Sequence, residues 1–515
     1  MTRTRGIHGW LSALAALALW EIVAQIYPNS FVIAGPLDVL RHMAENTGLL
    51  SRAVTATLHN AAWGFLWGNL GAIILSCTVI LLPRSERTIS LLALTVFCLP
   101  LVATGPILRV LYGPGNGPQI ALAALAVYYT TYLALVVGLR AIPQNWSDLT
   151  RIYGRGRMTE LFYIRARASL PYLIAGLQIA APAAILGAMI GEFTGADRGL
   201  GVLTLRAMRS LDVDATWALA SLAATVSILV YGIIGWIGRR LVAHPASILM
   251  TPPPVQGREN WSRSLGKAVA LIALVLVLWH SVMDIFDLNR FFAKRPLDIW
   301  RYLTTNDEAR STLRTALTET SALTVPGYLA GLGLGAGLAI LLTLVPALSA
   351  TVLPAAIALR SVPIITTAPL IVLALGRGAA GTIIIVAVMI FFPTLIACLQ
   401  GLRQTPGQII DMFDSYAAGR LRLMRWARIP AMLPAFFASA RMAIPAAFLA
   451  VTTTEWLATG KGIGNLMALT ATTSNYNMLW SAIVVVTAAA TLAYLVVERI
   501  ERAILRVYAS EQVQG

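Results

Sequence analysis

The stretch Gly138–Pro171, GLRAIPQNWSDLTRIYGRGRMTELFYIRARASLP, recurs 263 positions later as Gly401–Pro434, GLRQTPGQIIDMFDSYAAGRLRLMRWARIPAMLP. The same register holds without an insertion from residue 100 to residue 217. Further matched positions are Pro100 with Pro363, Pro106 with Pro369, Pro182 with Pro445, Glu192 with Glu455, and Trp217 with Trp480. A repeat at one fixed spacing indicates that a single structural unit occurs twice in this chain.

The composition is that of a membrane protein. Of 515 residues, 57% are hydrophobic and only 12% are charged, and the mean hydropathy is +0.73. A bilayer-spanning helix needs about 20 apolar residues. Such runs occur at 9–27, 58–82, 89–112, 118–140, 172–192 and 216–238, and again at 266–288, 318–343, 346–375, 379–402, 435–456 and 478–498. The sequence therefore predicts an all-α polytopic protein with about 12 transmembrane helices in two six-helix repeats.

We expect repeat 1 to span 1–240 and repeat 2 to span 263–508, followed by a short tail, 509–515. The linker between them, 241–262, contains Pro252-Pro253-Pro254, which suits a surface connection. The run at 9–27 follows basic residues like a signal peptide, but its counterpart lies mid-chain, so a membrane helix is expected. The three cysteines, Cys77, Cys98 and Cys398, fall in apolar runs and are expected to pack there without a disulfide.

The net charge of +16 is concentrated in short loops. In a membrane protein this follows the positive-inside rule, so no nucleic-acid partner is inferred. Six arginines lie between the fourth and fifth runs of the first half, and five lie in the copy: Arg140, Arg151, Arg155, Arg157, Arg165 and Arg167, then Arg403, Arg420, Arg422, Arg425 and Arg428. These loops, both termini and the linker are then cytoplasmic. Six helices per repeat give both repeats the same orientation, related by an axis along the membrane normal.

The arginine-rich break is the most unusual part of each half. Leu149, Ile152 and Tyr153 follow helical spacing, and so do Met158, Leu161 and Phe162. This pattern predicts short amphipathic helices at the membrane surface. A single such segment could lie on anionic lipid. Two copies in equivalent positions favour docking onto a two-fold partner instead.

The arginine-rich break resembles a segment of a known protein family. The break is similar to the cytoplasmic loop of ABC-importer permeases, which reads Glu-Ala-Ala, three residues, Gly, nine residues, then Ile-x-Leu-Pro. The first copy has Asp148-Leu149-Thr150, Gly154 and Ile164, and the second has Asp411-Met412-Phe413, Ala417 and Ile429-Pro430. Both copies have Asp where the pattern has Glu and lack its two alanines. The second also lacks the glycine, and the first has Ala166-Arg167 where Leu-Pro is expected.

Further motifs resemble the branch of the family that handles nitrate, taurine, sulfonates and thiamine precursors. They are Leu19-Trp20 with Leu278-Trp279, Pro36–Leu40 with Pro296–Trp300, Gly191-Glu192-Phe193 with Thr454-Glu455-Trp456, and the Gly-x-Gly pairs Gly199/Gly201 and Gly462/Gly464. Members of this branch look like single six-helix subunits that pair. This chain resembles two such units fused, so one chain would act as a pseudo-dimer.

The resemblance implies a permease in a bacterial inner membrane, served by two cytoplasmic ATPase subunits and an extracytoplasmic solute-binding protein, with membrane lipid around it. The ATPases would grip segments 148–165 and 411–428 through Asp148, Tyr153, Gly154, Arg155, Arg157, Asp411, Tyr416, Ala417, Arg420 and Arg422. The chain has no Walker-type phosphate loop, no metal-ligand spacing and no nucleophile–base arrangement. It is therefore not expected to be an enzyme or to need a cofactor.

The resemblance also places the outer mouth and the translocation path. Glu192, Gly199, Gly201, Glu455, Gly462 and Gly464 form the outer-mouth motif, in which the carboxylates are expected to accept hydrogen bonds from the glycine-rich turn. The four glycines are expected to supply turn conformations that are closed to other residues. Path candidates are Thr104, Met189, Thr366, Thr367, Thr452, Thr453 and Thr454, although threonine on a membrane helix more often bonds its own backbone. Tyr128-Tyr129 and Phe391-Phe392 are expected to be core residues.

One rival function remains open at this stage. A secondary, ion-coupled transporter can also have six plus six helices in parallel repeats. It would need protonatable groups near the membrane midplane, but the charges near apolar runs, namely Glu21, Arg109, His280 and Glu319, do not recur between the halves. They are expected to sit near helix ends. A scaffold or membrane enzyme is a third, weaker alternative, and the solute itself is not identified by the sequence.

Overall fold

The computed structural model describes residues 18, 20–26, 33–142, 144–242, 261–349, 352, 371, 376 and 378–508, and no strand occurs among them. In repeat 1 the elements are α2 (Pro36–Glu45), α3 (Thr47–Leu81), η1 (Pro83–Ser85), α4 (Glu86–Phe97), α5 (Leu101–Tyr112), α6 (Gly117–Arg140), α7 (Gln144–Ile152), α8 (Arg157–Glu160), η2 (Leu161–Arg165), α9 (Ala166–Phe193), α10 (Leu200–Arg209) and α11 (Val213–Leu241).

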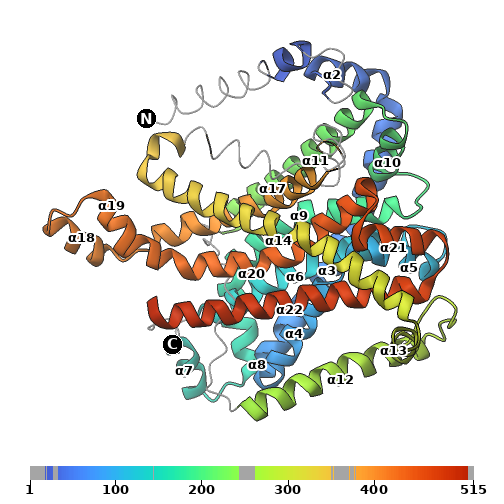
Figure 1. Cartoon of the computed structure of the whole chain (residues 1–515). Helices are drawn as coiled ribbons and strands as arrows, with labels where there is room; N and C mark the ends of the chain where they lie inside the picture. Colours follow the sequence, from blue (N-terminus) through green and yellow to red (C-terminus); the bar gives the residue numbers. More distant parts are fainter. Residues whose placement is uncertain are drawn as a thin grey trace.

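Repeat 2 has the same succession as far as it is described. Its elements are α12 (Trp261–Ile285), α13 (Pro296–Thr305), α14 (Asp307–Leu344), η3 (Pro346–Leu348), α17 (Ala379–Arg403), α18 (Gly407–Ser415), α19 (Arg420–Leu423), η4 (Met424–Arg428), α20 (Ile429–Thr454), η5 (Glu455–Thr459), α21 (Gly462–Thr472) and α22 (Tyr476–Tyr508). Figure 1 shows the long helices gathered in one bundle, with the short helices α18 and α19 projecting from it on the left.

The predicted all-α membrane fold is confirmed. Within the described residues, eight helices are long and apolar enough to cross a membrane, and a bent pair would make nine. The eight are Thr47–Leu81, Gly117–Arg140, Arg157–Phe193, Val213–Leu241, Asp307–Leu344, Ala379–Arg403, Arg420–Leu457 and Tyr476–Tyr508. They contain the predicted runs 118–140, 172–192, 216–238, 318–343, 379–402, 435–456 and 478–498, and all but the last residue of the run 58–82. The runs 9–27 and 346–375 lie mostly outside the described residues.

The run 89–112, predicted as one helix, is instead two helices. α4 and α5 meet at 89°, at a break formed by Cys98, Leu99 and Pro100. Pro100 has no N–H to continue the α4 hydrogen-bond ladder, and its ring disfavours helical geometry at Leu99. The backbone of Pro100 is extended, with φ −71° and ψ 103°. A hydropathy window records apolarity across such a break and so misses the change of direction.

Close helix approach in both repeats depends on matched glycines. A Cβ on Gly68 of α3 would overlap the backbone of Ala124 on α6, and a Cβ on Gly331 of α14 would overlap the backbone of Ala387 on α17. These two glycines are 263 positions apart, and the two helix pairs are counterparts. Small residues at contacts between membrane helices let the two backbones approach closely. Close approach increases van der Waals packing, which matters in lipid because the hydrophobic effect does not drive helices together there.

The two halves are joined through α4 and α5. Cys98 and Tyr129 of repeat 1 share a buried cluster with Ile444, Ala490 and Tyr494 of repeat 2. On the far side of the break, buried residues of α5 pack among α14, α21 and α22: Ala103 and Ile107 meet Leu313, Ile463, Met467 and Leu479. The expected core role of Tyr128-Tyr129 is confirmed, because both side chains are buried and Tyr129 stacks on Phe97 at 4.4 Å between ring centroids.

Candidate functional site

The two arginine-rich breaks are folded in the same way. Each consists of a short helix, a turn, a second short helix and a π-helical stretch that runs into a membrane helix: α7, α8 and η2 in repeat 1, α18, α19 and η4 in repeat 2. The π stretches Leu161–Arg165 and Met424–Arg428 are 263 positions apart. We call these two regions, residues 144–165 and 407–428, the paired segments. Figure 1 shows α18 and α19 projecting from the bundle on the left, and α7 and α8 along its lower edge.

Large apolar side chains stand exposed at matched positions of the paired segments. Tyr153 is 74% exposed and its counterpart Tyr416 is 81% exposed. Three further exposed pairs are Leu149 with Met412, Met158 with Leu421, and Tyr163 with Trp426. The predicted amphipathic helices are therefore present, and their predicted apolar side chains are exposed except for Leu161, which is buried. Clustered exposed apolar groups among charges are typical of a surface that meets a partner or lipid.

Arginines hold the base of the first segment to the bundle. The Arg165 guanidinium donates to Glu160 Oε1 at 2.6 Å and to the Leu139 carbonyl, at the end of α6, at 2.7 Å. Arg140, also at the end of α6, pairs with Glu86 at 2.5 Å. A cation near a helix C-terminus is stabilised by the helix dipole. The segment is thereby tied to the ends of the membrane helices, so that a displacement of one would be transmitted to the other.

The second segment lacks this ion pair and carries a strained turn. Leu423 stands where repeat 1 has Glu160. Gly154 and its counterpart Ala417 both have left-handed backbones, with φ of 66° and 49°. This conformation costs a residue with a Cβ about 1–2 kcal/mol. The left-handed turn thus explains why glycine suits this position in repeat 1. Repeat 2 adopts the same backbone conformation with an alanine.

A second matched site lies near the end of α9 and of α20. Glu192 is buried; its Oε1 accepts a hydrogen bond from Thr57 Oγ1 at 2.8 Å, and its Oε2 accepts one from Gly201 N at 2.7 Å. Thr57 Oγ1 in turn accepts one from Leu200 N at 2.8 Å. We call this arrangement the carboxylate latch, because it joins α3, the end of α9 and the start of α10.

Repeat 2 contains a matching latch, built on Glu455 and Thr320. Glu455 accepts from Thr320 Oγ1 at 2.8 Å and from Gly464 N at 2.9 Å, and Thr320 Oγ1 accepts from Ile463 N at 2.9 Å. The expected hydrogen bonds from the glycine-rich turn are therefore present in both halves. The two threonines were missed by the sequence analysis. Their 263-residue spacing was the available signal, but it falls outside the stretch 100–217.

The four glycines at the latches are required for two different structural reasons. Gly199 and Gly462 have left-handed backbones, with φ of 139° and 82°, and a Cβ on either would overlap the latch carboxylate. Gly201 and Gly464 lie inside helices, and a Cβ there would instead overlap the carbonyls of Met189 and Thr452. The expectation that all four supply special turn conformations is thus correct for the first pair and wrong for the second.

Substituting Gly199 with alanine is expected to lower the free energy of unfolding by at least about 2 kcal/mol, because it adds backbone strain and displaces a buried, hydrogen-bonded carboxylate. Thermal unfolding of the purified protein in detergent measures this. Gly232→Ala is the matched control, since no atom lies within 4 Å of a Cβ at that helical position. Equal unfolding temperatures for the two variants would contradict the role given to the latch.

The path candidates that the structure describes line neither of the two hollows reported below. All five described candidates are buried: Thr104, Met189, Thr452, Thr453 and Thr454. The hydroxyls bond carbonyls of their own helices, for instance Thr453 Oγ1 to Leu449 O at 2.6 Å. This is the ordinary behaviour of threonine on a membrane helix. Thr366 and Thr367 lie outside the described residues, so a path through these positions stays a prediction.

The four charges noted near apolar runs all have partners. Glu21 accepts from Leu37 N at 3.2 Å, and Glu319 accepts from Gly462 N at 2.9 Å. His280 lies 3.2 Å from Asp284, and Arg109 donates to the Gly115 carbonyl at 3.4 Å.

A buried ion pair in repeat 2 was overlooked. Arg441 of α20 lies 2.7 Å from Glu501 of α22, and their residues are 6% and 8% exposed. The guanidinium also faces the Tyr494 ring, 5.9 Å from its centroid. The signal was a single arginine inside the apolar run 435–456. The counterparts in repeat 1, Gln178 and Gly238, are neutral.

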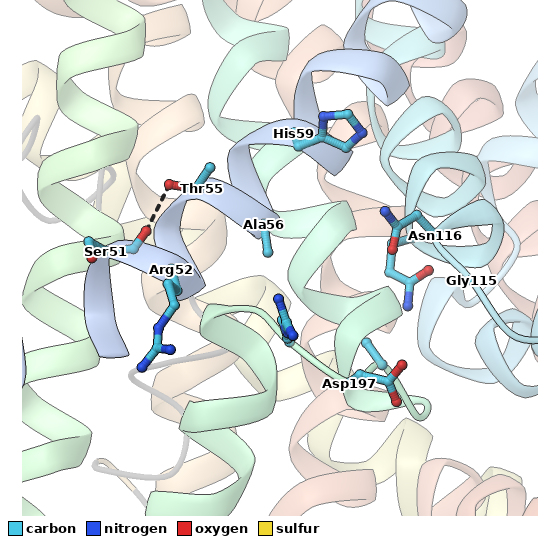
Figure 2. Close-up of a pocket in the computed structure, with 11 residues that line it drawn as sticks. Ser51, Arg52, Thr55, Ala56, His59, Gly115, Asn116 and Asp197 are labelled. Carbon is cyan, nitrogen blue, oxygen red and sulfur yellow. Dashed lines mark hydrogen bonds between the residues drawn. The ribbon is translucent and has the colours of Figure 1, made fainter. Parts of the chain in front are cut away.

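Two hollows lie on the side of the bundle away from the paired segments. One, of about 660 Å³, lies between the start of α3, the loop before α6 and the turn after α9 (Figure 2). The other, of about 350 Å³, lies between the start of α13, the loop before it and α22, and Arg290, Lys294 and Arg301 line it.

Comparison with known proteins places these features in context. The family described as binding-protein-dependent transport system inner membrane component matches residues 65–243 and again 331–506. The chain is 29% identical over 232 residues to a probable ABC transporter permease protein of Haemophilus influenzae, covering 44% of this chain and 93% of that protein. It is 25% identical over 222 residues to the formylaminopyrimidine transport permease ThiX of Halalkalibacterium halodurans, covering 43% and 89%. It is 27% identical over 229 residues to the putative aliphatic sulfonates transport permease SsuC of Escherichia coli, covering 44% and 84%.

Proposed function

Because the chain belongs to the family of binding-protein-dependent transport system inner membrane components, and carries two copies of its domain, we propose that it forms a whole translocation unit by itself. The chain is a permease of an ATP-binding-cassette transport system in the inner membrane, and it is not an ATPase. Such systems combine the permease with ATPase subunits and a solute-binding protein. In this chain the two halves that pair are covalently joined.

The observation that carries this proposal is the presence of the two arginine-rich paired segments, whose apolar side chains are exposed. Each presents apolar side chains at the same four positions, and each is continuous with a membrane helix, α9 or α20. A two-fold set of ATPases would find two equivalent docking surfaces on one chain. Closure of the ATPases would then move the paired segments and, through these helices, the walls of the path. In this proposal the paired segments lie on the cytoplasmic side, as the positive-inside rule favours, and the carboxylate latches lie on the outer side.

The solute is a small polar or anionic organic molecule in this proposal. The named substrates of related permeases, formylaminopyrimidine and aliphatic sulfonates, support that class. Ion coupling is disfavoured, because the recurring carboxylates Glu192 and Glu455 are occupied by threonine and backbone donors. The energy would come from the ATPases.

The proposal predicts one copy of this chain per pair of ATPase subunits. The measurement is the native mass of the complex purified through a tag on the ATPase, with and without a non-hydrolysable ATP analogue. The ATPases alone serve as the control for non-specific association. A complex holding two copies of this chain per ATPase pair would refute the single-chain unit.

A further inference from the structure

The two carboxylate latches differ by one acid. In repeat 2, Glu319 Oε2 accepts a hydrogen bond from Gly462 N at 2.9 Å. The position before the latch threonine in repeat 1 is Ala56. The counterpart residue, Gly199, is buried, and its N–H makes no hydrogen bond to the described residues. Repeat 1 therefore keeps the donor of this bond but lacks the side chain that accepts it.

A pocket opens at the place where that side chain would be. Ala56 lines the hollow of about 660 Å³, together with the cationic or titratable side chains of Arg52, His59 and Arg198 and the acid Asp197. Figure 2 shows Ala56 facing the loop that carries Asp197, with Arg52 and His59 on the same helix to either side. Pockets of roughly 300–1,000 Å³ hold small organic ligands.

The charges around this pocket complement an anion. The basic residues and their counterparts in repeat 2 are Arg52 with Thr315, His59 with Ala322, and Arg198 with Lys461. Two of the three positions are neutral in repeat 2, so the full basic set occurs only in the repeat that lacks the glutamate. No ion pair is formed by Arg52 or Arg198 within the described part of the chain. The turn leads into α10, a helix of ten residues whose N-terminal amides favour negative charge.

We propose that this pocket binds a carboxylate or sulfonate group of the solute at the outer mouth, in the position that the Glu319 carboxylate occupies in repeat 2. This proposal rests on the proposed import function. The oxyanion would accept from Gly199 N and from the Arg52 and Arg198 guanidinium groups. In repeat 2 the Glu319 side chain already fills the equivalent position. The proposed anion site is therefore present only in repeat 1, although the two halves are repeats of one unit.

Repeat 2 supplies the decisive variant. Ala56→Glu gives repeat 1 the same side chain that folds at this position in repeat 2, so it should fill the pocket and leave the fold intact. The probe is propionate, the small-molecule counterpart of a glutamate side chain, added to the purified full chain in detergent. The readout is the shift in unfolding temperature relative to chloride at the same ionic strength.

We expect a saturable upward shift for the wild type and none for Ala56→Glu. The double variant Arg52→Gln with Arg198→Gln should raise the half-saturating propionate concentration by about tenfold or more, because charge-assisted hydrogen bonds are lost. Glu319→Gln, the matched change in repeat 2, should leave the half-saturation unchanged. An equal response from wild type and Ala56→Glu would overturn the proposal.

A second assay separates this site from a docking contact. If Ala56→Glu reduces association with the binding protein while propionate shifts neither chain, the pocket receives a carboxylate of that protein, and the solute site is refuted. The propionate measurement needs no ATPase. A failure of the chain to assemble with ATPases would therefore overturn the proposed import function without altering the binding result.

Discussion

Replacing Tyr153 and Tyr416 together with aspartate is expected to abolish uptake while the chain remains inserted and folded. Both side chains are more than 70% exposed, so the substitutions remove no core contact. Burying one large apolar side chain in a partner is worth roughly 1.5–3 kcal/mol, and two sites act in the same complex. A carboxylate would also be desolvated in that interface. Uptake of the solute into cells and co-purification of the ATPase are the two measurements.

A matched control is Tyr508→Asp. Tyr508 is an exposed tyrosine at the end of α22, outside the paired segments. It should leave uptake near the wild-type level. The competing explanation is that both tyrosines only anchor the segments in lipid headgroups. Wild-type uptake together with wild-type ATPase co-purification in the double variant would favour that explanation over docking.

The single tyrosine changes should be unequal, because the segments are not equally stable. The first is fixed by the Glu160–Arg165 pair and has glycine at its left-handed turn. The second has Leu423 in place of the acid and holds the left-handed turn with Ala417. The strained, less anchored segment relies more on its partner for order. We therefore expect Tyr416→Asp to reduce ATPase association more than Tyr153→Asp does.

The sequence predicted the fold in the parts where one physical signal dominates. Long apolar runs identified the membrane helices, since a span needs length and apolarity alone. The fixed register of the repeat then identified the paired segments and the matched glycine-rich turns. The sequence did not predict the bend at Pro100, because a proline in an apolar run is compatible both with a kinked helix and with the end of a helix. The direction of α5 after the 89° bend involves tertiary packing against repeat 2, which an apolar pattern does not report.

The sites were predictable in part for a similar reason. Glu192 and Gly201 are nine residues apart, so their hydrogen bond is a local feature that a turn motif suggests. Thr57 is 135 residues from Glu192, and only the fold brings them together. The ion pair of Arg441 and Glu501 spans two helices and has no counterpart in repeat 1, so neither locality nor repetition pointed to it. The expected path threonines were chosen by position alone, whereas burial and backbone bonding decide where their hydroxyls go.

That ion pair leads to the largest expected effect on stability. Arg441→Leu should lower the free energy of unfolding by about 3–5 kcal/mol, because it leaves the Glu501 carboxylate buried without its partner. Replacing both members, Arg441→Leu with Glu501→Leu, should recover most of the loss, since apolar side chains of similar volume can replace a buried pair at little cost. Thermal unfolding of the single and double variants measures the coupling.

The control is the neighbouring pair of Arg502 and Glu498, which lies largely at the surface with 3.4 Å between its charged atoms. Arg502→Leu should change stability by no more than about 1 kcal/mol. Tyr494, under the Arg441 guanidinium, shares a buried cluster with Tyr129 of repeat 1. The loss of the pair should therefore loosen the contact between the halves as well as repeat 2 itself. If Arg441→Leu and Arg502→Leu lower the unfolding temperature equally, the buried pair has no special part in holding α20 to α22.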